Sequence, residues 1–160
     1  MGFQKWVREH FVTADAVYGL ILYSALVAGV SDDHSSSLEV LGLSVASLVI
    51  FWGAHVFAGT VAGHGAEVSL GASLRRSFGH SSGMLYAAIL PSLALLLGVF
   101  NLISADDAVN LALLVGTVVL GLLGFYAFSQ RKRGIIIRIL GGLGTAMFGL
   151  LMIVLNVVVH

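Results

Sequence analysis

Five long apolar stretches, separated by short polar connectors, constrain this chain more than any other feature of its sequence. They cover residues 14–30, 38–62, 84–103, 108–128 and 135–159. Four have about 20 residues or more, and the first is just long enough for an α-helix to cross ~30 Å of hydrocarbon. Lipid offers the backbone no hydrogen-bond partners, so a crossing segment of this kind must be helical. We predict an all-α polytopic membrane bundle of five transmembrane helices.

Composition excludes most soluble protein classes. Of 160 residues, 58% are hydrophobic and only 10% are charged, whereas soluble domains have about 25% charged residues. Eight basic and eight acidic side chains leave no basic excess of the kind that nucleic-acid binding requires. The absence of cysteine excludes disulfides and thiolate metal sites. We expect the lipid bilayer as partner, no nucleic acid and no cofactor.

The charged residues predict an orientation. All lysines and arginines fall in or near the N-terminus and the connectors 63–82 and 129–134, which five spans place on one side; Asp32, Asp33, Asp106 and Asp107 fall opposite. By the positive-inside rule, the N-terminus is cytoplasmic and the C-terminus external. Residues 1–12 mix aromatic and charged side chains and predict an interfacial helix, ahead of a single transmembrane domain over 13–160. We expect a bacterial cytoplasmic membrane.

Several acidic residues fit helix-capping patterns. Ser36 with Glu39, and Ser104 with Asp107, have the spacing of a capping box at the start of a span. Thr13 with Asp15 fits the start of the first span in a similar way. Asp15 also allows a second interpretation, because it enters the membrane with Gly19 and Tyr23 following at steps of four.

His55 is the ionisable residue placed deepest in an apolar stretch, and intramembrane ionisable residues are functional candidates by default. An imidazole can carry a proton or bind a metal near neutral pH; the alternative is a neutral histidine packed against a backbone carbonyl or a hydroxyl. His64 lies on the opposite helix face, and we expect His64 and His80 to be solvated in the 63–82 connector. The candidate transport path consists of Asp15, Tyr18, Ser44, Ser47 and His55.

Small residues recur at steps of three or four on the predicted spans, as in tightly packed membrane helices. The packing candidates are Gly59 in the second span and Gly142, Thr145 and Gly149 in the fifth. Motifs of soluble hydrolases, zinc proteases and nucleotide-binding enzymes are absent, so we do not expect an enzyme.

The stretches Asp15–Gly29 (DAVYGLILYSALVAG) and Gly134–Gly149 resemble the vacuolar iron transporter family, with looser similarity over Gly53–Thr60. The layout also looks like that of small uncharacterised bacterial membrane proteins. The family resemblance implies a homodimer that exports divalent metal against protons along a path between the first two helices. The chain departs from the family at two places. Tyr18 directly precedes the glycine of the first span, where the family has an acidic residue close by. The second span has His55 and no methionine, where the family has acidic residues and methionine. The 63–82 connector is too short for the family's metal-collecting insert.

Two functions follow from these patterns. The first is a small, oligomeric transporter or channel for a proton or a divalent metal ion, with its path lined by the first two spans and His55 as the metal candidate. The second is a non-transporting scaffold or accessory subunit that binds partner helices through glycine and alanine faces.

Overall fold

The computed structural model describes residues 13–31, 35–64, 68–129 and 134–159, which fold into five α-helices. These are α2 (Ala14–Val30), α3 (Ser37–Gly63), α4 (Leu70–Val99), α5 (Ala105–Ser129) and α6 (Ile135–Val159). The predicted all-helical fold is confirmed. The interfacial helix expected over residues 1–12 lies outside the described residues. Four helices, α3 to α6, are long and apolar enough to cross a membrane, and α2 is a shorter apolar helix. These four helices indicate an integral membrane protein.

Helix α4 is the main departure from the predicted boundaries. It begins at Leu70, where the Ser69 hydroxyl accepts a hydrogen bond from the Ala72 amide, and it continues unbroken through Pro91. The polar stretch 70–82 is therefore helical rather than part of a connector. The reason is local: this stretch has an N-cap serine and lacks proline, so its polar side chains do not prevent a helix.

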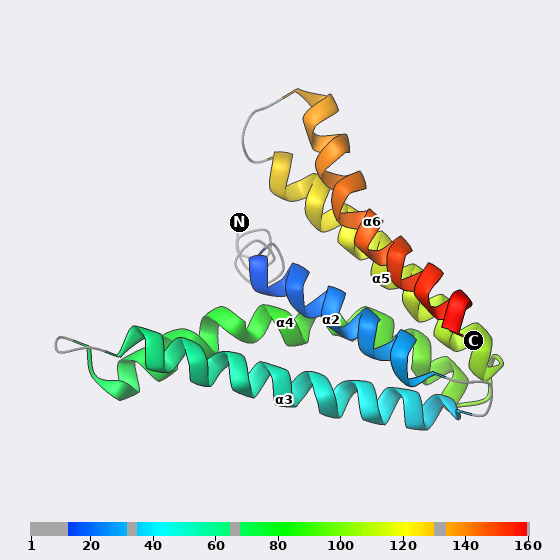
Figure 1. Ribbon diagram of the computed structural model, residues 1–160, viewed down its shortest axis with the longest axis horizontal. Helices are drawn as coiled ribbons and strands as arrows, with labels where there is room; N and C mark the ends of the chain where they lie inside the picture. The colour runs from blue at the N-terminus through cyan, green and yellow to red at the C-terminus, as the bar shows by residue number, and fades with distance from the viewer. Residues whose placement is uncertain (1–12, 32–34, 65–67, 130–133, 160) are drawn as a thin grey trace.

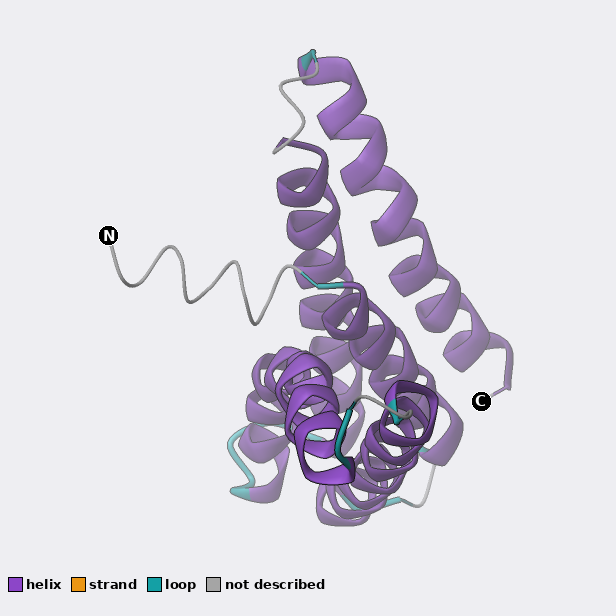
Figure 2. Cartoon of the chain, turned by 90° about the vertical axis from the view of Figure 1, so that its left-hand side faces the viewer, coloured by secondary structure: helices purple, strands orange, loops and turns teal. Residues whose placement is uncertain are grey.

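The helices form two hairpins around a central helix. Helices α3 and α4 pack together as one hairpin and α5 and α6 as the other, and α2 contacts all four. The hairpins converge where α2 ends and separate toward its start (Figure 1), and the second view shows the α5–α6 hairpin standing away from the rest (Figure 2). We call these two regions the converging end and the splayed end. The start of α2, the end of α3 and the start of α4 lie toward the splayed end, as do the end of α5 and the start of α6.

The converging end is closed by well-formed helix caps. Ser36 and Glu39 form the predicted capping box. The Ser104 hydroxyl donates a hydrogen bond to the Asp107 carboxylate and accepts one from the Asp107 amide. Helix α4 ends at Val99 with Phe100 as its C-cap, and Asn101 follows with a φ of 57°, the left-handed conformation that asparagine tolerates. Carbonyl groups in the last turn of α4 accept hydrogen bonds from the amides of Asn101 and Leu102.

The larger hydrophobic cluster lies toward the converging end. It joins α2, α3, α4 and α5 through Tyr23, Val27, Val40, Leu95 and Leu113, among others. A smaller cluster nearer the splayed end contains Ala16, Leu20, Ala87, Leu120 and Leu123. Packing beside the smaller cluster is close, because a Cβ on Gly19 would lie 2.5 Å from the Met84 Cα. The core is therefore tightly packed between the two ends.

Candidate functional site

The splayed end holds a group of ionisable side chains from three helices. Asp15 lies in the first turn of α2, where the Thr13 hydroxyl accepts a hydrogen bond from the Ala16 amide and caps the helix as predicted. The Asp15 carboxylate faces two imidazoles: His55 Nε2 lies 3.4 Å from its Oδ1, and His80 Nε2 lies 3.6 Å from its Oδ2. We call Asp15, His55 and His80 the Asp–His cluster.

The three members lie at the same height in the bundle. His55 lies eight residues before the end of α3, or about 12 Å, and His80 lies ten residues after the start of α4, or about 15 Å. Asp15 is the second residue of α2, so the shorter helix α2 begins at this level. The outer turns of the two hairpins extend beyond it (Figure 1). The cluster thus lies several helical turns in from the outer end of the α3–α4 hairpin.

Burial differs sharply within the cluster. The Asp15 side chain is 11% exposed, whereas those of His55 and His80 are 43% and 73% exposed. Asp15 Oδ2 is buried and makes no hydrogen bond, since His80 lies beyond hydrogen-bond distance. A buried carboxylate oxygen without a partner is unfavourable, and a small movement of the exposed His80 side chain would supply a donor. The arrangement can therefore hold a proton between a buried carboxylate and two accessible imidazoles.

The structure brings together three of the five path candidates. Asp15 and His55 belong to the cluster, and Tyr18 stacks on the His55 ring with centroids 6.2 Å apart. Ser44 and Ser47 lie eleven and eight residues before His55 on α3, about 16 and 12 Å away. Ser44 is fully buried and without a hydrogen-bond partner, and Ser47 is half-buried.

His80 is the cluster member that sequence reasoning missed. Its side chain is 73% exposed, in line with the expected solvation, but it lies in α4 rather than in a connector and faces Asp15. The available signal was the N-cap Ser69 followed by a stretch without proline, which puts His80 on a helix. His64, by contrast, caps α3 at the exposed outer end, and its Nδ1 lies 3.1 Å from the Val68 carbonyl oxygen.

The packing candidates lie at helix contacts within the chain. Gly59 faces Ser77 of α4, and on α6 Gly142 and Gly149 face Gly121 and Thr117 of α5. The Thr145 hydroxyl donates to the Leu120 carbonyl of α5 at 2.8 Å. The glycine face of α6 is therefore used against α5.

Two further polar levels follow toward the converging end. The Ser92 hydroxyl donates to the Tyr23 hydroxyl at 2.7 Å in the middle of the bundle, and Ser24 and Ser44 are buried there without a hydrogen-bond partner. At the converging end, the Asn156 amide donates to the Ser31 hydroxyl at 2.8 Å. The polar groups are thus arranged in levels separated by apolar side chains.

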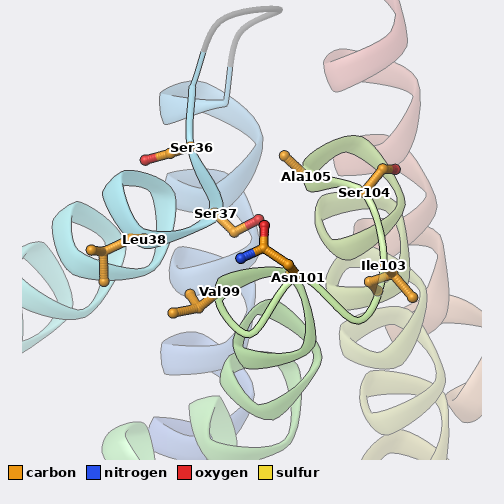
Figure 3. Close-up of a pocket in the computed structure, with 9 residues that line it drawn as sticks. Ser36, Ser37, Leu38, Val99, Asn101, Ile103, Ser104 and Ala105 are labelled. Atoms are coloured by element: carbon orange, nitrogen blue, oxygen red, sulfur yellow. The ribbon is translucent and has the colours of Figure 1, made fainter.

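A pocket of about 350 Å³ opens at the converging end (Figure 3). Its lining comes from the start of α3, the end of α4 and the start of α5, and includes Ser37, Asn101 and Ser104. None of the described residues that line it is titratable.

Within the described residues, no group of three or more His, Cys, Asp or Glu side chains is arranged to hold a metal ion. In the Asp–His cluster a separate carboxylate oxygen faces each imidazole. No protein-family model, curated protein or solved structure matches this chain.

Proposed function

We propose that this protein is a cation transporter of a bacterial cytoplasmic membrane, with five spans and a cytoplasmic N-terminus, and that its cation is the proton. The observation that carries the proposal is the Asp15 carboxylate, largely buried and facing His55 and His80 from two other helices. Buried carboxylates and histidines at membrane depth are the groups from which proton relays are built. Imidazoles suit this role because they gain and lose protons near neutral pH.

In this proposal His80 exchanges protons with the aqueous side, since it is the most exposed member of the cluster. Asp15 accepts the proton from it, and His55, stacked on Tyr18, lies on the other side of the carboxylate. The Tyr23–Ser92 pair forms the next polar level toward the opposite face. The close contact of Gly19 with Met84 separates the first two levels, so transport requires α2 to move relative to α4.

The test is proton flux in proteoliposomes that contain a pH-sensitive dye. We expect the wild-type protein to dissipate an imposed pH gradient and Asp15→Asn to slow it at least tenfold, because the amide cannot take up the proton. His55→Gln and His80→Gln should each slow it by a smaller factor. His64→Gln is the matched control, a histidine of α3 outside the cluster, and should leave the rate unchanged.

Two outcomes would contradict the proposal. Wild-type protein that dissipates no gradient would remove the transport function, and an Asp15→Asn rate equal to that of His64→Gln would remove the cluster from the path. The resemblance to vacuolar iron transporters suggests divalent metal as a second cargo, so the same vesicles are tested with a metal-sensitive dye. Metal flux without proton flux would replace the proton as substrate.

A scaffold function is the second candidate, and one observation favours it. Gly42 and Gly53 of α3 have open space where a Cβ would lie, so this outer face of α3 is not packed within the chain. A homo-oligomer contact or a partner helix would suit such a face. Purification of one specific partner in mild detergent, together with no flux, would favour this function over transport.

A further inference from the structure

The outer part of the α3–α4 hairpin combines exposed apolar side chains with two arginines. We call it the α3–α4 tip, residues 56–64 and 68–79, which comprise the end of α3, the start of α4 and the described residues next to them. Its exposed large apolar side chains include Phe57, Val61, Leu70, Leu74 and Phe78, with exposed fractions from 46% to 70%. Arg75 and Arg76 lie among them on α4, and both are exposed. Such a surface is unfavourable in water alone and equally so in hydrocarbon alone.

Neither arginine is neutralised within the described part of the chain. Arg75 and Arg76 make no ion pair there, and the described residues of the tip include no acidic side chain. Glu67 belongs to the connector, outside the described residues. The two guanidinium groups, consecutive on α4, therefore offer hydrogen-bond donors of the kind that match phosphate oxygens.

Helix lengths place the tip in one leaflet's headgroup layer. The 27 residues of α3 and 30 residues of α4 are about 40 and 45 Å long, which matches a bilayer of ~40–45 Å including its headgroups. The 17 residues of α2 cover only about 25 Å. For helices along the membrane normal, Arg75 and Arg76 lie about 8 Å from the outer end of α4, level with lipid phosphates.

The tip is held in shape by contacts between its two helices. The Ser73 hydroxyl donates to the Thr60 carbonyl at 2.9 Å, and Gly59 faces Ser77 closely. Next to the tip, Trp52 packs edge-on against Phe78 with centroids 5.0 Å apart. The arginines are thus presented by a fixed helical surface.

We propose that the α3–α4 tip binds the headgroup of an anionic phospholipid, with Arg75 and Arg76 on the phosphate and the apolar side chains of the tip against the upper acyl chain. The apolar surroundings favour a lipid over a free phosphate, since a soluble anion leaves the apolar side chains exposed to water. The proposal is independent of any transport activity.

The test is lipid retention measured by native mass spectrometry. Protein is purified from equal mixtures of phosphatidylglycerol and phosphatidylcholine, and the retained ratio of the two lipids is compared between variants. We expect wild-type protein to retain phosphatidylglycerol preferentially. R75Q/R76Q should lower the ratio about 25-fold, at about fivefold for each arginine near a membrane surface. R138Q, which removes an arginine of α6 outside the tip, should leave the ratio unchanged.

Further variants keep the test decisive. If R75Q/R76Q does not fold, the single variants should each show about a fivefold loss, and R75K/R76K should keep most of the preference because charge is retained. No preference in wild-type protein, or equal losses in R138Q and R75Q/R76Q, would overturn the proposal. Displacement of the lipid by excess inorganic phosphate would indicate a site for a soluble anion and would also overturn it.

Discussion

The two ends of the bundle use polar side chains in different ways. At the converging end, the polar groups of Ser36, Ser104 and Asn156 each have a hydrogen-bond partner nearby. At the splayed end, Asp15 Oδ2 is buried without one, and its neighbours are two imidazoles that can change their charge. Satisfied polar groups fix a structure, whereas groups left without a partner are poised for exchange. We therefore expect the converging end to contribute mainly to stability, whereas the proposed transport function rests on the splayed end.

Glycine-to-alanine substitutions in α4 should give the largest difference between the two ends in the free energy of unfolding. At Gly98 a Cβ would lie 2.6 Å from the Ala108 Cβ and 2.9 Å from the Ser37 Cβ, so Gly98→Ala forces α3, α4 and α5 apart. Overpacking of this kind lowers the free energy of unfolding by about 1–3 kcal/mol. Gly71 lies in open space at the splayed end of the same helix.

Gly71→Ala is therefore the matched control, and it should leave the free energy of unfolding unchanged or raise it slightly, because alanine favours helix. Both variants are measured by denaturant titration in detergent. Equal losses at the two positions would mean that the converging end is no more tightly packed than the splayed end.

The N-cap serines provide a second comparison between the ends. Ser36 and Glu39 form a reciprocal capping box on α3, whereas Ser69 accepts one bond of 3.3 Å at the start of α4. We expect Ser36→Ala to lower the free energy of unfolding by about 1 kcal/mol and Ser69→Ala by about 0.5 kcal/mol. The same titration measures both, and a larger loss for Ser69→Ala would reverse the assignment of stability to the converging end.

A substitution at Asn156 tests whether the converging end contributes to stability without contributing to proton flux. Its amide contacts the Ser31 hydroxyl and the Ala28 carbonyl, so Asn156→Leu should cost about 0.6 kcal/mol, the average for a hydrogen bond between membrane helices. Proton flux per folded molecule should stay the same. A flux loss comparable to that of Asp15→Asn would instead place Asn156 in the transport path, at its far end.

The fold was more predictable than the site, for reasons visible in particular residues. Lipid forces apolar stretches into helices, so α2 and α6 begin and end at the predicted residues, and the capping patterns at Ser36 and Ser104 locate two further helix starts. The Asp–His cluster depends on how α2 packs against α3 and α4, and periodicity within one helix carries no information about that. His55 was found because it lies in an apolar stretch; His80 was missed because it lies in a polar one.

Tyr18 should give the smallest effect, and it separates ring stacking from hydroxyl chemistry at the splayed end. Its ring stacks on His55 at 29° between planes, while half of the residue is exposed. Tyr18→Phe keeps the ring, so proton flux should remain within about twofold of wild type. Tyr18→Ala frees the His55 ring to leave Asp15 and should slow flux about threefold, since an aromatic pair contributes about 0.5–1.5 kcal/mol. Flux measured on both variants in the same vesicles decides between two roles for this side chain. Loss in both would make the hydroxyl a proton carrier and extend the cluster to four residues, whereas loss in Tyr18→Ala alone would make Tyr18 a positioning residue for His55.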